Sequence, residues 1–252
     1  LGTLGWWLRE VGVDLKTIGL FALVGLPDSF KFLWAPVMDH APVPVLTRLL
    51  GRRRGWVAIL LLALLYKFGD AVSGQMTSPF YYDMQFSKLE VASVTKVWSI
   101  VATMAGITAG GALVAAVGTF RALLLGGVLQ ALTNLLFTAL ALIGHSVPML
   151  AVAVGADSFT GGLAGAAFVA YLSSLTNVRF TGTQYALLTS LMAGGRTVLS
   201  AGSGWLAQQL GWAAFFAATA ALAIPGLLLL LWLMRLGDPD EDLPLSPARE
   251  AS

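Results

Sequence analysis

The sequence predicts an all-α polytopic membrane protein, a bundle of about seven transmembrane helices. Of its 252 residues 57% are apolar and only 11% are charged, whereas a soluble domain carries roughly 25% charged residues. The apolar runs are continuous and long enough for helices, while a transmembrane β-barrel would show short alternating segments. The same numbers exclude soluble, disordered, collagen-like and nucleic-acid-binding classes. The absence of cysteine excludes a disulfide framework.

Seven segments are long and apolar enough to cross a bilayer, which requires about 20 residues per helix. They cover residues 17–38, 56–79, 90–117, 120–143, 147–172, 183–210 and 212–235. Residues 1–16 have the pattern of the end of an earlier helix followed by a short loop. Residues 237–252 are rich in proline and acidic residues, a composition typical of a disordered tail.

The distribution of cationic residues outside these spans predicts the orientation of the chain. Eight lie on one side: Arg48, Arg52, Arg53, Arg54, Arg121, Arg179, Arg235 and Arg249. Three lie on the other: Arg9, Lys16 and Lys88. Because cytoplasmic loops carry the excess of Lys and Arg, the GRRRG loop and the C-terminus are expected in the cytoplasm.

Charged residues inside the spans are the first candidates for function, because each costs about 2.5–3.5 kcal/mol at a helix centre on insertion scales. Two pairs place opposite charges three residues apart on one helix face: Asp28–Lys31 and Lys67–Asp70. Three further charges lie alone on separate spans: Lys96, Asp157 and Arg196. For Lys31 and Lys96, snorkelling to the interface is an equal alternative. For Asp157 and Arg196, an interior ion pair or a water-lined cavity is the stronger interpretation.

Runs of small residues recur at 106–118, 161–167, 193–196 and 201–204. Close helix approach explains them without a ligand, and hinge flexibility in a rocking carrier is the alternative. No enzyme signature is present: the sequence has neither GxSxG nor HExxH. The two histidines, His40 and His145, lack metal-ligand spacing, so neither an enzyme nor a metal site is expected.

Particular stretches resemble AmpG-type muropeptide permeases of the major facilitator superfamily. IGLFALVGLPDSFKFLWAPVMDH (18–40) and GRRRGW (51–56) are similar to the second helix and adjoining cytoplasmic loop of that family. The second half is matched, in order, by YKFGDA (66–71), TSPFYYDMQFSKLEVASVTK (77–96), FRALLLGGVLQALTN (120–134), GGLAGAAFVAYLSSLTN (161–177) and QYALLTSLMAGGR (184–196).

This resemblance implies a proton-driven importer that carries N-acetylglucosaminyl-1,6-anhydro-N-acetylmuramyl peptides from periplasm to cytoplasm across the bacterial inner membrane, without a cofactor other than the proton gradient. It implies a role in peptidoglycan recycling, which feeds β-lactamase induction in Gram-negative bacteria. Substrate would bind near the bilayer midplane, between two halves that rock. The partners are therefore the lipid bilayer, the muropeptide and protons, and no nucleic acid.

The candidate residues fall into three groups. Those for proton coupling or ion pairing are Lys67, Asp70 and Asp157. Those for the substrate cavity are Lys96, Gln130, Asn134, Tyr171, Gln184 and Arg196. Those for the gating loop are Asp39, Arg52 and Arg53, in a stretched version of the superfamily's D-R-x-G-R-R motif. The aromatic residues Tyr81, Tyr82, Phe168 and Trp205 could stack on sugar rings, although packing or a lipid interface is the better interpretation.

The chain departs from the family pattern in particular residues and by a gap. His40 replaces the arginine expected after Asp39, Asp157-Ser158 replaces Glu-Asn, and Asp28 stands at a position usually tyrosine-like. After GRRRGW, four helices of the family are missing before YKFGDA, together with most of the first helix. A deletion, a partial gene and a deliberately shortened chain are the three open interpretations.

We therefore expect residues 1–55 to be a remnant of the first half, 56–236 a six-helix second half and 237–252 a tail, and this chain alone to be inactive. The alternatives are an acetyl-CoA-type or other carrier of the superfamily, or a non-transporting remnant or scaffold.

Overall fold

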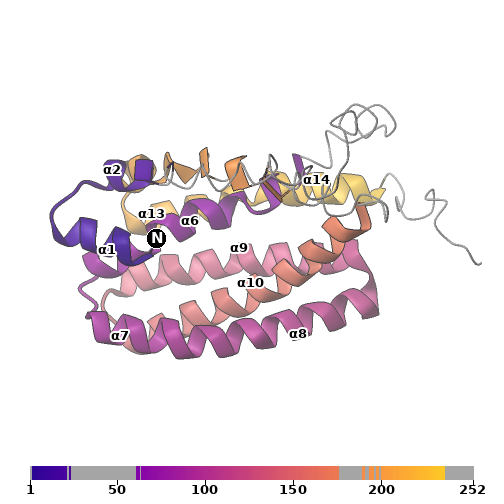
Figure 1. Cartoon of the computed structure of the whole chain (residues 1–252), viewed down its shortest axis with the longest axis horizontal. Coiled ribbons are helices and arrows are strands. Elements are labelled where there is room, and N and C mark those ends of the chain that lie inside the picture. Colours follow the sequence, from indigo (N-terminus) through magenta and orange to yellow (C-terminus); the bar gives the residue numbers. More distant parts are fainter. Residues whose placement is uncertain are drawn as a thin grey trace, which may run out of the picture.

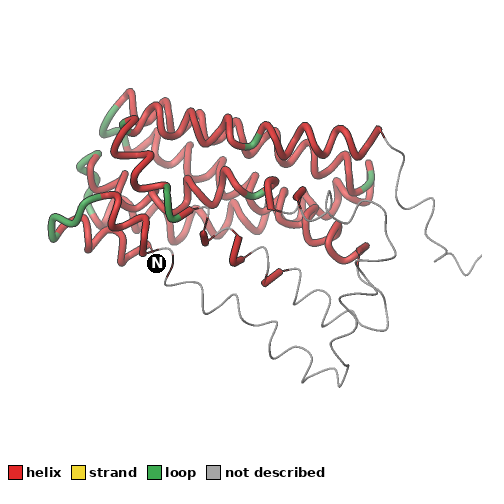
Figure 2. The backbone as a smooth tube through the Cα atoms, turned by 90° about the horizontal axis from the view of Figure 1, so that it is seen from above, coloured by secondary structure: helices red, strands yellow, loops and turns green. Residues whose placement is uncertain are grey.

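The computed structural model describes residues 2–21, 23, 61–62, 64–175, 189–190, 193–195, 197–198 and 200–235. Within this part every regular element is helical, as Figure 2 shows. The elements are α1 (Gly2–Glu10), α2 (Leu15–Leu20), α6 (Phe68–Asp83), α7 (Lys88–Ser93), the π-helical segment η2 (Val94–Trp98), α8 (Ser99–Val117), α9 (Thr119–Ile143), α10 (Val147–Leu175), α12 (Ser203–Leu210), α13 (Trp212–Leu222) and α14 (Ile224–Arg235).

Four helical stretches in the described part are long and apolar enough to cross a membrane: Lys88–Val117, Thr119–Ile143, Val147–Ser174 and Trp212–Arg235. They coincide with four of the predicted spans, so the all-α membrane bundle is confirmed. In Figure 1 they lie lengthwise, with α1, α2 and α7 at the left-hand end and α14 reaching the right-hand end. The predicted spans 17–38, 56–79 and 183–210 fall partly outside the described residues.

Local sequence explains where these helices begin and end. Ser87 caps α7 through a capping box, because its side chain accepts from the Glu90 amide and the Glu90 carboxylate accepts from the Ser87 amide. Glycines with positive φ at 118, 144 and 211 then separate the long helices, which only glycine adopts at little cost. At the start of α2, Asp14 accepts a hydrogen bond from the Thr17 amide at 3.4 Å. Hydrogen bonding by Thr17 lowers the pKa of the Asp14 carboxyl below its ordinary value.

The predicted span 56–79 differs from the structure in two ways: the helix is interrupted within it, and it ends later than predicted. The backbone leaves helical geometry at Lys67 (φ −101°, ψ 8°), so α6 starts at Phe68. Close helix contacts flank this break: a Cβ on Gly226 would lie 3.0 Å from the Leu65 carbonyl, and one on Gly69 would lie 2.8 Å from a carbonyl of α13. Helix α6 also continues through Pro79 to Asp83.

Helices α8 and α10 approach so closely that only small residues fit between them. A Cβ on Gly162 of α10 would lie 2.5 Å from the Thr103 carbonyl oxygen of α8, and one on Gly110 of α8 would lie 2.6 Å from the Leu163 carbonyl oxygen. This supports the prediction that the small-residue runs serve close helix approach. We call this contact the glycine seam.

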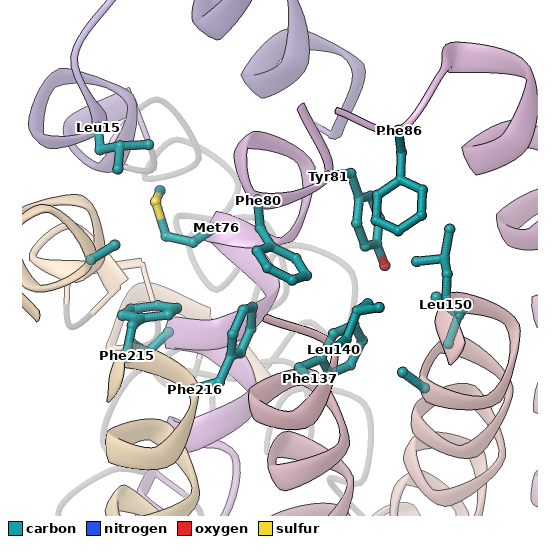
Figure 3. Close-up of a cluster of buried hydrophobic side chains, with 14 of the residues drawn as sticks. Leu15, Met76, Phe80, Tyr81, Phe86, Phe137, Leu140, Leu150, Phe215 and Phe216 are labelled. Atoms are coloured by element: carbon teal, nitrogen blue, oxygen red, sulfur yellow. The ribbon is translucent and has the colours of Figure 1, made fainter. Parts of the chain in front are cut away.

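Buried apolar side chains form two clusters separated along the bundle. The first, at the α1–α7 end, gathers aromatic rings from α6, α9 and α13, including Phe80, Phe137 and Phe216; Figure 3 shows these rings converging. The second joins Leu62 and Tyr66 to α9, α10 and α14. Polar side chains occupy the stretch between the clusters.

Candidate functional site

Asp157 lies in the middle of the bundle. It is ten residues into α10, which places it about 15 Å from the start of that helix, or half of a hydrocarbon core of about 30 Å. Its Oδ1 accepts a hydrogen bond from Gln130 Nε2 at 2.9 Å and lies 3.4 Å from Thr133 Oγ1. The Thr133 hydroxyl has one proton and a shorter contact, 2.8 Å, with the Gln130 carbonyl of its own helix. Gln130 is therefore the principal donor to this carboxylate.

Lys67 and Asp70 form an ion pair at the start of α6, with Lys67 Nζ 3.0 Å from Asp70 Oδ2. Their side chains are 17% and 23% exposed, so the pair is mostly shielded from solvent. Asp70 also lies in the first turn of α6, where the free amides of the helix N-terminus favour a negative charge. The predicted i,i+3 pair therefore forms as the sequence suggested.

Two cavities meet at Asp157. The first, of about 740 Å³, is lined by residues of α6, α8, α9, α10 and α13 that include Asp70, Gln130 and Gly161; we call it the Asp70 cavity. The second, of about 650 Å³, extends toward α1 and α7 past Glu10, Lys88 and Lys96; we call it the Lys96 cavity. The lining residues that the two cavities share are Thr77, Phe137, Asp157 and Ser158.

The Lys96 cavity has both cationic and aromatic lining. Lys96 belongs to the π-helical segment η2, a rare geometry that is frequent at functional sites, and it forms no ion pair with any residue that the structure describes. Trp6, Trp7 and Tyr81 line the same cavity. Such a lining suits a ligand that carries both anionic and ring-shaped groups.

Other predicted residues lie elsewhere. Asn134 is 2% exposed and borders neither cavity. Tyr171 is also 2% exposed, and its ring packs edge-on against Phe120 in the second apolar cluster. Among the aromatic residues suggested for sugar stacking, Phe168 stacks on Tyr66 and Trp205 is exposed. The functional predictions for these residues remain predictions.

The predicted residues Gln184, Arg196, Asp39, Arg52 and Arg53 lie outside the described residues, as do Asp28 and Lys31. In the part of the chain that is described, no group of three His, Asp or Glu side chains could hold a metal ion.

Sequence reasoning missed an ion pair at the α1–α7 end. Arg9 donates from Nε and Nη2 to the two carboxylate oxygens of Asp83, at 2.8 and 3.0 Å, and Trp212 Nε1 donates to the same carboxylate at 3.1 Å. This cluster joins α1, α6 and α13. No sequence pattern could reveal it, because Arg9 and Asp83 are 74 residues apart.

Comparison with known proteins defines the class. A family profile of the Major Facilitator Superfamily matches residues 59–251, and a profile described as Acetyl-coenzyme A transporter 1 matches residues 1–107. With the helical membrane bundle and its central cavities, the first match places the chain in the major facilitator superfamily, to which it belongs.

Its relatives narrow the class further. The chain is 37% identical over 242 residues to the anhydromuropeptide permease of Escherichia coli K12, covering 91% of this chain and 49% of that protein. It is 35% identical over 182 residues to the putative transporter AmpG 4 of Rickettsia felis, covering 72% of this chain and 44% of the relative. The predicted resemblance to AmpG-type permeases is thereby confirmed. The chain spans about half the length, or less, of these curated relatives.

Proposed function

We propose that this chain provides the second half of a proton-coupled carrier that imports anhydromuropeptides from the periplasm to the cytoplasm. The observation that carries the proposal is the 37% identity to a named anhydromuropeptide permease, in a chain whose Asp157 borders two cavities at the centre of the bundle. A glycopeptide offers hydroxyls, amides and carboxylates. The two cavities offer matching partners in Gln130, Lys96 and Asp157.

The proton role is assigned to Asp157 because of its position and partners. A carboxylate between two cavities can exchange a proton with either of them, and inside a membrane such a group marks an ion or proton pathway. Asp70 lines one of the same cavities but is already neutralised by Lys67 at 3.0 Å. Asp157 has neutral hydrogen-bond donors only, at 2.9 and 3.4 Å, so it is the carboxyl whose charge is less well compensated.

The distribution of arginines supports an orientation of the chain in the membrane. Arg121 and Arg235 lie at the end of the bundle opposite to α1 and α7, whereas Arg9 and Lys88 lie at the α1–α7 end. Under the positive-inside rule, the Lys96 cavity faces the periplasm and the C-terminus is cytoplasmic.

The chain alone is proposed not to transport, because between Trp56 and Tyr66 it lacks four helices that the family pattern contains. That junction falls largely outside the described residues. A chimera supplies the missing part: the first half of the E. coli permease joined to residues 56–235 of this chain. In energised membrane vesicles the chimera should accumulate labelled anhydromuropeptide, and a protonophore should abolish the accumulation. Accumulation by vesicles that contain only this chain would contradict the proposed incompleteness.

The proton role is tested in the same chimera by Asp157→Asn, which keeps the size of the side chain and removes its charge. We expect loss of proton-driven accumulation with exchange of labelled for unlabelled substrate retained. Tyr82, which does not line either cavity, offers a control through Tyr82→Phe, which should accumulate normally. Proton-driven uptake at the wild-type rate in the Asp157→Asn chimera would contradict the assignment.

The match of residues 1–107 to the acetyl-coenzyme A transporter profile favours a second candidate, a carrier of CoA thioesters. Competition separates the two. Excess unlabelled anhydromuropeptide should suppress the uptake of labelled anhydromuropeptide by the chimera, and excess acetyl-CoA should leave that uptake unchanged. The reverse result would favour the second candidate.

A further inference from the structure

The side-chain oxygen of Gln130 is a buried acceptor that no described residue satisfies. Gln130 is 8% exposed, and its Nε2 donates to Asp157 while its Oε1 has no hydrogen-bond partner in the described part of the chain. Buried polar atoms of this kind are rare in native structures and call for a partner. Gln130 lines the Asp70 cavity.

A glycine of α10, Gly161, lies next to this oxygen. A Cβ on Gly161 would lie 3.6 Å from Gln130 Oε1, so a longer side chain at residue 161 would crowd the approach to the acceptor. Gly161 lines the Asp70 cavity as well. The acceptor therefore has an unmet hydrogen bond and lies beside a cavity-lining residue that has no side chain.

The charge of Asp157 determines which end of the amide faces the cavity. An ionised carboxylate only accepts hydrogen bonds, so it selects the orientation with Nε2 toward Asp157 and Oε1 toward the cavity. A protonated Asp157 carries an O–H that can donate to Oε1. The amide can then turn over, with Nε2 facing the cavity as a donor.

Charged and titratable groups reach this region from α6 and from η2, and the paired side chains of Glu10 in α1 and Lys88 in α7 line the Lys96 cavity as well. The Lys67–Asp70 pair and Tyr81 come from α6, and Lys96 comes from η2. From α9, the polar side chains at Asp157 are Gln130 and Thr133, both neutral. Because Lys67 neutralises Asp70 at 3.0 Å, Asp157 supplies the uncompensated negative charge of the Asp70 cavity, and while ionised it opposes an anionic ligand.

We propose that Gln130 transmits the protonation of Asp157 to the ligand by turning its amide. With Asp157 protonated, the Asp70 cavity presents an N–H and one negative charge fewer, and it binds a carboxylate. With Asp157 ionised, the cavity presents a carbonyl oxygen and a full negative charge, and the carboxylate is released. This deepens the proposed function: the proton and a carboxylate of the peptide portion are bound together and released together.

The first test needs no ligand. The full chain is reconstituted in lipid nanodiscs with ¹⁵N-glutamine, and the Gln130 side-chain amide signal is identified by its loss in Gln130→Met. We expect the signal to shift through a single titration, and the shift to vanish in Asp157→Asn. A signal that stays constant with pH, or that titrates equally in Asp157→Asn, would overturn the proposed switch.

The second test measures binding of anhydromuropeptide to the nanodisc-reconstituted chain and to the chimera at several pH values. Acidification should tighten binding about tenfold, the order expected when a mismatched buried hydrogen bond is replaced by a matched one. Amidation of the ligand's carboxylates should remove this gain. Gln130→Met, which has similar length but cannot form the amide hydrogen bonds, should remove it too.

Thr133→Val is the matched control, because it removes a contact to the same carboxylate without changing a group that lines either cavity. The acid gain should persist in Thr133→Val, and its persistence in Gln130→Met would overturn the inference. If neither the reconstituted chain nor the chimera binds anhydromuropeptide at any pH while the Gln130 signal still titrates, the proposed substrate is wrong and the switch stands.

Discussion

The Lys67–Asp70 pair gives a prediction in which the two partners are not equivalent. Asp70 is in the first turn of α6, so without Lys67 it still faces the amides of the helix N-terminus. Lys67 without Asp70 is a cation next to that same positive end. We therefore expect Asp70→Asn to destabilise the protein more than Lys67→Met does.

The magnitudes follow from burial and helix geometry. Removing one partner of a fully buried ion pair costs about 3–5 kcal/mol. Because these side chains are 17% and 23% exposed, we expect a smaller loss of about 1–3 kcal/mol from the pair. The helix terminus is worth about 1 kcal/mol to Asp70, and this sets the expected difference between the two variants. The double variant leaves no unpaired charge, so a coupling energy of about 1–2 kcal/mol is expected.

The assay is equilibrium unfolding in mixed micelles, followed by circular dichroism, for both single variants and the double variant. Lys88→Met is the control, because its pair with Glu10 is 67% and 43% exposed and is expected to contribute less than about 1 kcal/mol. Two results would refute the reasoning: a Lys67 variant that costs as much as the Asp70 variant, or a double variant whose cost equals the sum of the single ones.

Three further predictions concern packing and caps. Gly162→Ala should be less stable than Gly165→Ala by about 1–3 kcal/mol in the same unfolding assay, because a Cβ at 162 meets a carbonyl of α8 at 2.5 Å whereas at 165 it meets nothing within 4 Å; equal stabilities would contradict the glycine seam. Asp83→Asn should lower the free energy of unfolding by about 1–3 kcal/mol. Adding Arg9→Gln to the Asp83→Asn variant should lower it little further, because the two side chains share one interaction. Additive losses would show that the two residues act independently. The pKa of the Asp14 carboxyl is lower in the folded chain than in the unfolded chain, so the cap stabilises α2 above the pKa of the unfolded state, and this stabilisation is lost as the pH falls through the pKa of the folded state. Amide hydrogen exchange in α2 should accelerate over that pH range. Asp14→Asn should abolish this acid dependence.

Much of the architecture could be predicted from the sequence because it depends on local properties. Long apolar runs separated by glycines gave the four long helical stretches to within about three residues at each end. Composition alone indicated that Asp157 was exceptional, since a lone carboxylate in such a run is costly unless it is bonded. The Lys67–Asp70 pair followed from its spacing on one helix face.

The remainder depends on contacts between distant segments. Gln130 and Asn134 are four residues apart on α9 and share one face, yet only Gln130 borders a cavity. The difference arises from α10, which brings Asp157 to the level of Gln130. In the same way, the backbone break at Lys67 could not be predicted locally, since lysine itself is a good helix former; close contacts at Gly69 of α6 and Gly226 of α14 flank the break.

The shared lining of the two cavities would allow a single carboxylate to serve both sides of the proposed carrier. Thr77 and Phe137 come from α6 and α9, and Asp157 and Ser158 come from α10, so the boundary is formed by three different helices. The glycine seam holds α10 against α8, whereas the Arg9–Asp83 pair ties α6 to α1. In the proposed importer, a small displacement of α6 relative to α10 would therefore change which cavity reaches Asp157 without breaking the seam.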